Sequence, residues 1–173
     1  MGKFIHAPVI PADDQWRLEK LQGFKILDTP PEAPFNYIAA QAACLCNTPI
    51  AIVSLVDKYR VWYKASVGMD GLQEVPREDS LCSMVILQDA VTVFQDALED
   101  PCLLANPFVA GDFGLRFFAG APIRTEDGFR LGAVCVIDQK PRSFSAEDQQ
   151  NLEKLAAQAM QEIKARLCQP VAN

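Results

Sequence analysis

The chain begins with two stretches in which apolar residues recur every three or four positions, the spacing of amphipathic helices. The first stretch contains Trp16 and Leu21, and Gly23 can end a helix there. The second covers residues 30–46, where Thr29 stands at the position of an N-cap. The pattern therefore predicts a short helix followed by a longer one.

Two strand patterns follow these helices. Residues 50–57 are apolar on both alternating faces, which is typical of a central strand covered on both sides. Residues 61–68 alternate, which predicts a half-exposed strand near an edge of the sheet. One face of this strand is expected to carry Val61, Tyr63, Ala65 and Val67, and the other Trp62, Lys64 and Ser66.

The middle of the chain is less regular. Residues 79–87 predict a short helix that Asp79 or Ser80 opens, and residues 91–94 predict a brief strand. Residues 95–116 then form the longest stretch with little regular patterning. Loops of this length in compact domains are commonly functional or mobile, so we expect this loop to exchange its amide hydrogens rapidly.

The last third of the chain predicts a hairpin and a helix. Residues 117–125 and 129–138 read as strands, and Asp127-Gly128 between them is a strong turn signal. Ser145 caps a final helix, whose apolar stripe comprises Leu152, Leu155, Ala156, Ala159, Ile163 and Leu167. Hairpin connections between strands, with helices before and after them, predict an α+β domain with a mostly antiparallel sheet.

Composition narrows the class of partner. The 173 residues are half apolar and carry a net charge of −6, which argues against nucleic acid or an anionic membrane surface as a partner. No apolar run approaches the roughly 18–20 residues of a membrane span. The first ten residues, MGKFIHAPVI, lack the apolar core of a signal peptide, so we expect a cytoplasmic protein.

Catalytic and metal-binding patterns do not emerge from the residue types present. The sole histidine is His6, so neither a Ser-His-Asp nor a Cys-His set can be assembled. The six cysteines are scattered through predicted helices and strands, which favours free thiols over a disulfide scaffold or a zinc site. We therefore expect no enzyme, no catalytic residue, no bound metal and no cofactor.

Several blocks of the sequence carry a resemblance to a known family. They read RLEKLQGFKILDTPPE, IAIVSLVDKYRVWYKASVG, PREDSLCSMVI, DPCLLANPFV and LRFFAGAPIRTEDGFRLGAVCVIDQKPRSFS, in this order. In these blocks the chain resembles the GAF domain, a small-molecule sensor module, as found in bacteria near histidine kinases and diguanylate cyclases. The resemblance covers residues 14–168, which leaves an N-terminal arm of residues 1–13 and a tail of residues 169–173.

The resemblance implies a specific architecture. A five- or six-stranded sheet would carry the terminal helices on one face and a ligand pocket on the other, beneath a roof formed by residues 77–87 and 95–116. The strands that hold Trp62, Val93, Phe118 and Cys135 would form the floor. The residues expected to bind the ligand are Trp62, Arg77, Ser80, Cys82, Val93, Asp96, Arg116, Phe118 and Cys135.

Departures from the family's motifs argue against several of the ligands that other members bind. Cys82 is followed by Ser83, where bilin-binding members usually have histidine, and no histidine is available for haem. The stretch Asn106-Pro107-Phe108 does not supply the motif of cyclic-nucleotide-binding members. The free methionine sulfoxide reductases of the same fold use cysteines near the pocket, which leaves thiol chemistry at Cys82 and Cys102 as an alternative.

Three of the candidate residues can also have a purely structural role. Cys82 can simply fill space, and we favour that over a redox role or covalent ligand attachment. Arg77 and Arg116 can bind an anionic ligand, or they can tie the roof to Asp96, Asp100 or Asp112.

We therefore expect a sensor that transmits the state of an unidentified small ligand through its terminal helices. A homodimer or a signalling partner such as a histidine kinase or cyclase would receive the signal. The alternatives are a thiol-based redox enzyme or sensor, and a dimerisation module whose pocket is filled in. Ala156 and Met160 widen the stripe of the last helix, and this extra apolar surface is the basis for the predicted dimer.

Overall fold

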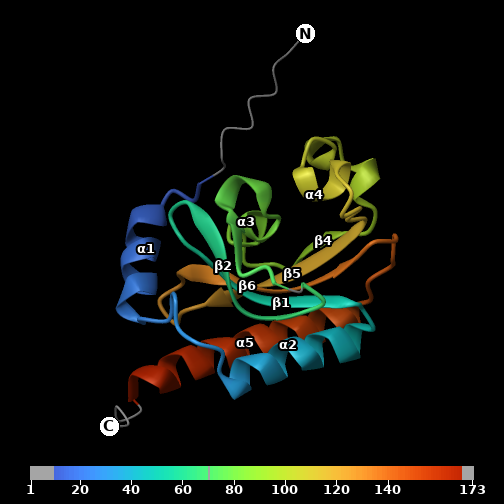
Figure 1. Ribbon diagram of the computed structural model, residues 1–173. Coiled ribbons are helices and arrows are strands. Elements are labelled where there is room, and N and C mark those ends of the chain that lie inside the picture. Colours follow the sequence, from blue (N-terminus) through green and yellow to red (C-terminus); the bar gives the residue numbers. More distant parts are fainter. Residues whose placement is uncertain (1–9, 70, 169–173) are drawn as a thin grey trace.

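A six-stranded sheet lies between two layers of helices (Figure 1). The computed structural model describes residues 10–69 and 71–168, so most of the predicted arm, with His6, and the tail at 169–173 lie outside it. The helices are α1 (Asp14–Gly23), α2 (Ala33–Cys46), α3 (Cys82–Val85), α4 (Pro107–Ala110) and α5 (Ala146–Cys168). The strands are β1 (Ile50–Val56), β2 (Arg60–Val67), β3 (Glu74–Pro76), β4 (Thr92–Phe94), β5 (Phe117–Arg124) and β6 (Arg130–Asp138).

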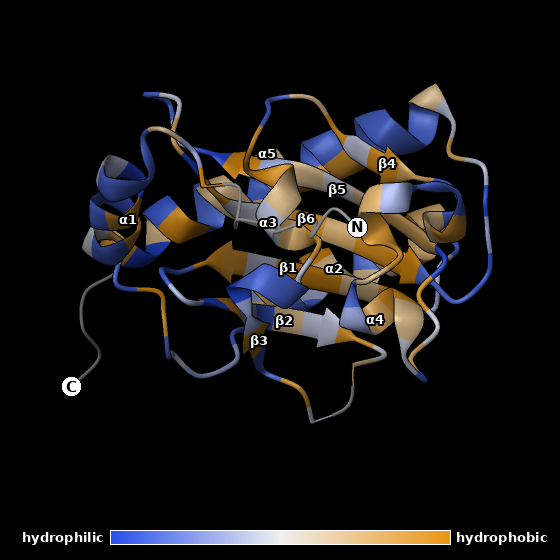
Figure 2. Cartoon of the chain, turned by 90° about the horizontal axis from the view of Figure 1, so that it is seen from above, coloured by the Kyte–Doolittle hydropathy of each residue, from blue (hydrophilic) through white to orange (hydrophobic). Residues whose placement is uncertain are grey.

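The sheet order is β3-β2-β1-β6-β5-β4, and every neighbouring pair is antiparallel. The predicted α+β class with an antiparallel sheet of five or six strands is confirmed, and the sheet has six. β1 is buried at every position and lies near the middle of the sheet, as its apolar pattern predicted. Figure 2 shows hydrophobic residues concentrated along the central strands, with hydrophilic residues in the surrounding loops.

The sheet separates two hydrophobic cores. The helix-side core packs α2 and α5 against one face, with residues such as Phe35, Ile38, Leu152 and Ile163 fully or almost fully buried. The roof-side core lies on the other face, beneath α3 and α4, and includes Ile52. Burying one such large apolar side chain contributes about 1.5–3 kcal/mol, so both faces of the sheet stabilise the fold.

The N-terminal ends of two helices test the predicted caps. The hydroxyl of Ser145 accepts from the amide of Asp148 at 3.0 Å, and the Asp148 carboxylate accepts from the amide of Ser145 at 3.0 Å, so Ser145 caps α5 as predicted. The predicted cap at Thr29 is wrong, because its hydroxyl donates to the carbonyl of Ile26 and α2 begins only after Glu32.

A β-bulge in β2 changes which residues face each core. Val53 pairs with Ala65 and Ser54 pairs with Tyr63, so Lys64 is the extra residue between them. A bulge shifts the alternation of side chains by one position, which the sequence pattern alone does not reveal.

As a result, the predicted assignment of side chains to the two faces of β2 is correct for the residues before the bulge and wrong for those after it. Ala65 and Val67 pack in the helix-side core together with Trp62, rather than with Tyr63 on the opposite face. The half-exposed strand is also a wrong prediction, because β3 covers its outer edge at residues 60–62 and Lys64 is only 3% exposed.

The long segment 95–116 contains more structure than its sequence predicted. It holds two 3₁₀ turns, η2 (Ala97–Glu99) and η3 (Pro101–Leu103), followed by α4. Asp96, Asp100 and Asn106 each accept a hydrogen bond from the backbone two residues later, so local side-chain caps order each turn.

Candidate functional site

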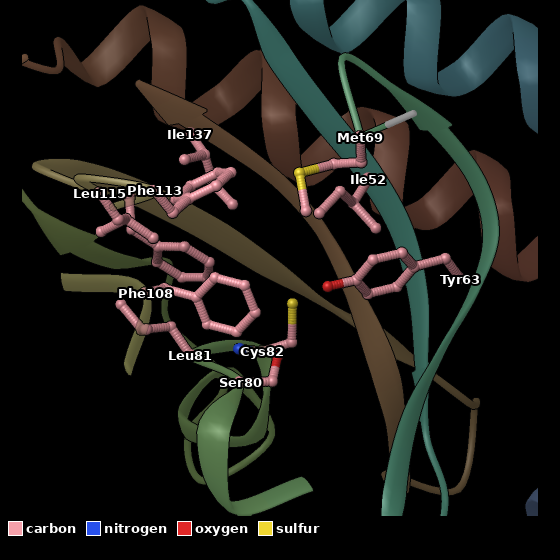
Figure 3. Close-up of a pocket in the computed structure, with 11 residues that line it drawn as sticks. Ile52, Tyr63, Met69, Ser80, Leu81, Cys82, Phe108, Phe113, Leu115 and Ile137 are labelled. Atoms are coloured by element: carbon pink, nitrogen blue, oxygen red, sulfur yellow. Dashed lines mark hydrogen bonds between the residues drawn. The ribbon is translucent and has the colours of Figure 1, made fainter. Parts of the chain in front are cut away.

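An apolar cavity lies between the sheet and the roof, which comprises residues 77–87 and 95–116 (Figure 3). Its volume is about 20 Å³. A space of this size holds roughly one water molecule. The residues that line it are Ile52, Tyr63, Met69, Ser80, Leu81, Cys82, Phe108, Phe113, Leu115, Phe118 and Ile137.

Aromatic side chains from the roof occupy most of the space that a ligand would need. The rings of Phe108 and Phe113 meet edge to face, with centroids 5.5 Å apart. They enter the cavity from one side, while Tyr63 and Met69 face them from the other (Figure 3). A ligand larger than water can therefore enter only after these two roof phenylalanines move.

Short polar contacts hold the roof together. The amide of Asn106, which begins α4, donates to the carbonyl of Asp79 at 2.9 Å. The hydroxyl of Ser83 donates to the carbonyl of Arg77, and that of Ser80 accepts from the amide of Cys82 at 3.2 Å. The two parts of the roof are therefore joined to each other, and each is stiffened locally.

α3 lies directly on the sheet at Gly120 of β5. A Cβ at this position would come within 2.6 Å of a methyl carbon of Val85. Glycine thus permits a close approach of the roof to the floor, which brings the first residue of α3, Cys82, against the central strands.

The cavity has hydrogen-bonding groups and no charge, as far as the described residues show. Its polar groups are the hydroxyls of Tyr63 and Ser80 and the thiol of Cys82. Burial raises the pKa of the Tyr63 hydroxyl, so it stays protonated and can donate a hydrogen bond. This chemistry suits a small, uncharged and mostly apolar molecule, because a charged one would lose its hydration without gaining a counter-ion.

The predicted ligand-binding residues separate into three places. Ser80, Cys82 and Phe118 line the cavity, and Cys135 lies next to it, with its sulfur 3.4 Å from that of Cys82. Trp62 and Val93 lie on strands of the floor but pack on the helix side of the sheet. Trp62 borders an open groove of about 860 Å³ between residues 28–31 and β2 instead.

The remaining three predicted residues have structural partners. Asp96 caps η2 by accepting from the amide of Leu98 at 3.1 Å. Arg116 donates to the carbonyls of Val109 and Leu115 at 3.0 and 2.8 Å, so it ties α4 to the end of the roof through backbone acceptors. Neither arginine of the roof takes the aspartate partners that the sequence suggested.

Arg77 joins the roof to α1. Its two terminal nitrogens donate to the carboxylate of Asp14 at 3.0 and 2.8 Å, and Arg17 donates to the same carboxylate at 2.8 Å. Burial alone would raise the pKa of Asp14, but the hydrogen bonds from the two arginines outweigh it and lower the pKa. A buried, charged cluster thus connects the beginning of the roof with the N-terminal helix.

A second cluster connects the β2 bulge with α5. Lys64 donates to the carboxylate of Glu32, to the hydroxyl of Thr29 and to the carbonyl of Pro30. Arg166, in the last turn of α5, donates to the same Glu32 carboxylate at 2.8 and 3.0 Å. The helices at both ends of the domain are therefore fixed by ion pairs, a buried one between α1 and the roof and a partly buried one between α5 and Glu32.

The sequence missed much of the cavity lining. Phe108 and Phe113 stand in a segment without periodicity, and Met69 follows the end of β2. Two phenylalanines five residues apart in an irregular segment were the available signal, since large aromatic side chains are usually buried.

The two cysteines of the thiol alternative have different surroundings. Cys82 is 2% exposed and its sulfur contacts Cys135, whereas Cys102 is exposed on η3. Within residues 10–69 and 71–168, no group of three or more His, Cys, Asp or Glu side chains converges in the way a metal ion requires. None of the helices in this part of the chain has the length and apolarity needed to cross a membrane.

Comparison with known sequences finds a relative that is named as an enzyme. It is 39% identical over 157 residues to a protein from Pseudomonas aeruginosa named as a cyclic di-GMP phosphodiesterase. The match covers 90% of this chain and 27% of that protein. The expectation that the protein is not an enzyme is contradicted by this relative, because the matching segment belongs to a named phosphodiesterase.

Comparison with solved structures supports the fold. The GAF domain of a phosphoenolpyruvate-protein phosphotransferase from Coxiella burnetii has a TM-score of 0.64 at 16% identity, and the match covers 89% of this chain and 94% of that one. A type II free methionine-R-sulfoxide reductase from Thermoplasma acidophilum has a TM-score of 0.57 at 18% identity, over 77% and 96% of the two chains. At these identities the likeness shows a shared fold and says nothing about a shared function.

The family follows from the sequence itself. Residues 30–163 match the GAF domain. The described structure adds the antiparallel sheet, the helices on one face and the roofed cavity on the other. The chain belongs to the GAF domain family.

Proposed function

We propose that this chain is a sensory domain that regulates a cyclic di-GMP phosphodiesterase, and that a small uncharged molecule beneath the roof is its signal. The observation that supports the regulated activity is the 39% identity to the Pseudomonas aeruginosa phosphodiesterase over 90% of this chain. Free thiols at all six cysteines agree with a cytoplasmic location for this activity.

The lining of the cavity supports the class of ligand. The described lining residues offer two hydroxyls, one thiol and otherwise apolar surface. A nucleotide carries phosphate charges that need cations or oriented amide groups, so it is a poor match for this surface. A small molecule with one or two hydrogen-bonding groups matches Tyr63 and Ser80.

Roof movement is the first step of the proposed mechanism. The closed cavity of about 20 Å³ must expand, so a ligand would favour a state in which Phe108 and Phe113 have moved outward. A ligand that binds only this open state shifts the population toward it by its difference in affinity.

Arg77 is the proposed route from the roof to the end of the domain. It belongs to η1 (Arg77–Asp79), at the beginning of the roof, and it holds Asp14 of α1. Displacement of the roof would therefore move α1 or break a buried ion pair, and either result changes what α1 presents to neighbouring parts of a protein.

A homodimer remains part of the proposal, but on a different surface. Ala156 and Met160 are 2% and 5% exposed and pack within the chain, so they do not supply the apolar surface that the prediction assumed. On α2, exposed residues recur at intervals of four and three positions, at Ala33, Tyr37 and Ala40. Charged substitution of Ala40 should convert a dimer into a monomer in light scattering, whereas the same change at exposed Lys58 should not.

The regulated activity can be tested in the relative. The matching segment of the Pseudomonas aeruginosa phosphodiesterase is replaced by this chain, and hydrolysis of cyclic di-GMP is compared with that of the parent and of a version lacking the segment. The proposal expects hydrolysis by the chimera to differ from that of the truncated version and to change with Arg77→Ala.

Glu19→Gln provides the matched control, because Glu19 is exposed on α1 and its loss leaves the Asp14 cluster intact. If the chimera and the truncated version hydrolyse cyclic di-GMP at equal rates, the regulatory role is contradicted.

A further inference from the structure

Two buried cysteines meet at the boundary between roof and floor. The sulfur atoms of Cys82 and Cys135 are 3.4 Å apart, and the side chains are 2% and 0% exposed. Cys82 begins α3 of the roof, whereas Cys135 lies in β6, 53 residues later. A space-filling role for each cysteine does not require their sulfur atoms to be in contact.

We propose that Cys82 and Cys135 form a dithiol that hydrogen peroxide oxidises to a disulfide, which joins the roof to the central sheet. This modification site goes beyond the proposed function, because it requires no ligand and no phosphodiesterase. It also differs from the thiol pair suggested by the sequence, since the exposed Cys102 takes no part.

The geometry needs only a small adjustment. A disulfide bond is about 2.05 Å long, so the two sulfur atoms must approach by about 1.4 Å from their separation of 3.4 Å. Cys135 is held in the sheet between Ile52 and Gly120, its partners in β1 and β5. The adjustment therefore falls on Cys82, which belongs to a helix of four residues.

The position of Gly120 supports this approach. It lies beside Cys135 in the sheet, and its missing Cβ is what allows Val85 of α3 to come so close. α3 is thereby held over the strand that carries Cys135. A larger residue at this position would lift α3 and separate the thiols.

Cys82 is the cysteine that reacts first. Cys82 lines the cavity, which has room for a molecule about the size of water, whereas Cys135 does not line it and has its sulfur 3.4 Å from that of Cys82. Hydrogen bonds from the Cys135 thiol and from the hydroxyls of Ser54 and Ser80 lower the pKa of Cys82 against the effect of burial. The neighbouring Cys82 and burial both raise the pKa of Cys135, so it remains the protonated partner.

The reaction balances with one peroxide. The Cys82 thiolate attacks one oxygen, the O–O bond breaks, and the other oxygen leaves as hydroxide, which takes up a proton to become water. The Cys135 sulfur then attacks the sulfur of the Cys82 sulfenic acid, and the second oxygen leaves as hydroxide with the proton of Cys135. Two thiols lose two electrons and two protons, and the peroxide becomes two waters.

The consequence is a change in the roof. A covalent bond between α3 and β6 prevents α3 from rising, so the cavity stays closed to larger molecules. Oxidised protein is therefore expected to show slower amide exchange in residues 80–87 than reduced protein, with little change in α2.

Peptide mapping tests the proposal directly. The purified protein is treated with hydrogen peroxide at neutral pH, its remaining thiols are alkylated, and the crosslinked peptides are identified by mass spectrometry. The expected principal crosslink joins Cys82 to Cys135, and the intact protein loses the mass of two hydrogens. Cys102→Ala should form it as the unchanged protein does, whereas Cys135→Ala should not.

Denatured protein provides the control for preorganisation, and it requires no variant to fold. In concentrated urea the crosslinks should spread over the six cysteines, because the contact between Cys82 and Cys135 is lost. The proposal is overturned if both cysteines of the folded protein stay reduced while exposed Cys44 or Cys102 oxidises. It is also overturned if folded and denatured protein give the same crosslinks.

Discussion

Arg77 and Asp14 form a bidentate ion pair across 63 residues of sequence, with nitrogen–oxygen distances of 3.0 and 2.8 Å. The pair is almost fully buried, and it joins the first residue of the roof to the first residue of α1. The pair thereby connects the roof to one end of the domain without involving the sheet.

Removing the charge of Asp14 should destabilise the domain strongly. Asp14→Asn leaves two buried guanidinium groups without their anion, and losing one partner of a buried pair costs about 3–5 kcal/mol. We expect the free energy of unfolding in urea to fall by about 3 kcal/mol, since the Asp14 side chain is 12% exposed. Glu19→Gln on the exposed face of α1 should change it by less than about 0.5 kcal/mol. Equal effects of the two variants would show that the cluster contributes nothing.

The same carboxylate should make stability depend on pH in acid. The pKa of Asp14 is lowered in the folded protein, so between the folded and unfolded values the unfolded chain binds more protons. The stabilisation is complete above the unfolded value of about 3.9 and is lost as the pH falls through the folded value. The difference in unfolding free energy between the unchanged protein and Asp14→Asn should therefore shrink from pH 7 to pH 3. A constant difference would contradict the assignment.

Gly132 is expected to tolerate no side chain. A Cβ there would lie 1.9 Å from the carbonyl oxygen of Ser54 in the neighbouring strand β1. Gly132→Ala must separate two central strands, so we expect a loss of more than about 4 kcal/mol or a failure to fold. Gly23→Ala is the matched control, since no atom lies within 4 Å of its Cβ and alanine favours the helix by about 0.5–1 kcal/mol. A folded Gly132→Ala protein of normal stability would contradict the close strand approach.

The roof should open more readily than the sheet. Segment 95–116 is built from turns of three or four residues with local hydrogen bonds, whereas β1 and β6 are central strands paired on both sides. In hydrogen-exchange mass spectrometry its amides should exchange faster than those of 50–56 and 130–138. Uniform strong protection of the segment would indicate a permanently closed roof.

The sequence predicted the elements whose pattern is set by burial alone. β1 and β6 were predictable because both of their faces are covered. α5 was predictable because Ser145 is a favourable N-cap and the apolar residues after it recur at helical spacing. Leu167 is the exception on α5, since the helix extends past the sheet and leaves it 50% exposed.

Features that depend on tertiary contacts were not predictable. The bulge at Lys64 moves the side chains of Ala65 and Val67 to the opposite face of the sheet, and no residue type in this stretch indicates a bulge. Strand β3 has only three residues, too few for a periodic pattern.

The candidate site was predicted as a region but not in detail. Ser80, Cys82 and Phe118 line the cavity because they lie at or near the short helix and on the strand that the family resemblance implies, and their role in binding a ligand stays a prediction. Arg77 was expected near a ligand or a roof aspartate. Its partner, Asp14, is 63 residues away, and only the folded structure brings them together.

Native mass spectrometry tests the central claim, that a small uncharged molecule binds beneath the roof. The purified protein is incubated with the small-molecule extract of the cells that produce it, and its mass is measured under native and denaturing conditions. We predict a non-covalent adduct that is present only under native conditions and absent after the cavity is narrowed by Ser80→Phe. Unchanged mass after incubation with the extract, in protein that remains folded, would contradict the sensory function and favour a domain whose cavity stays filled by Phe108 and Phe113.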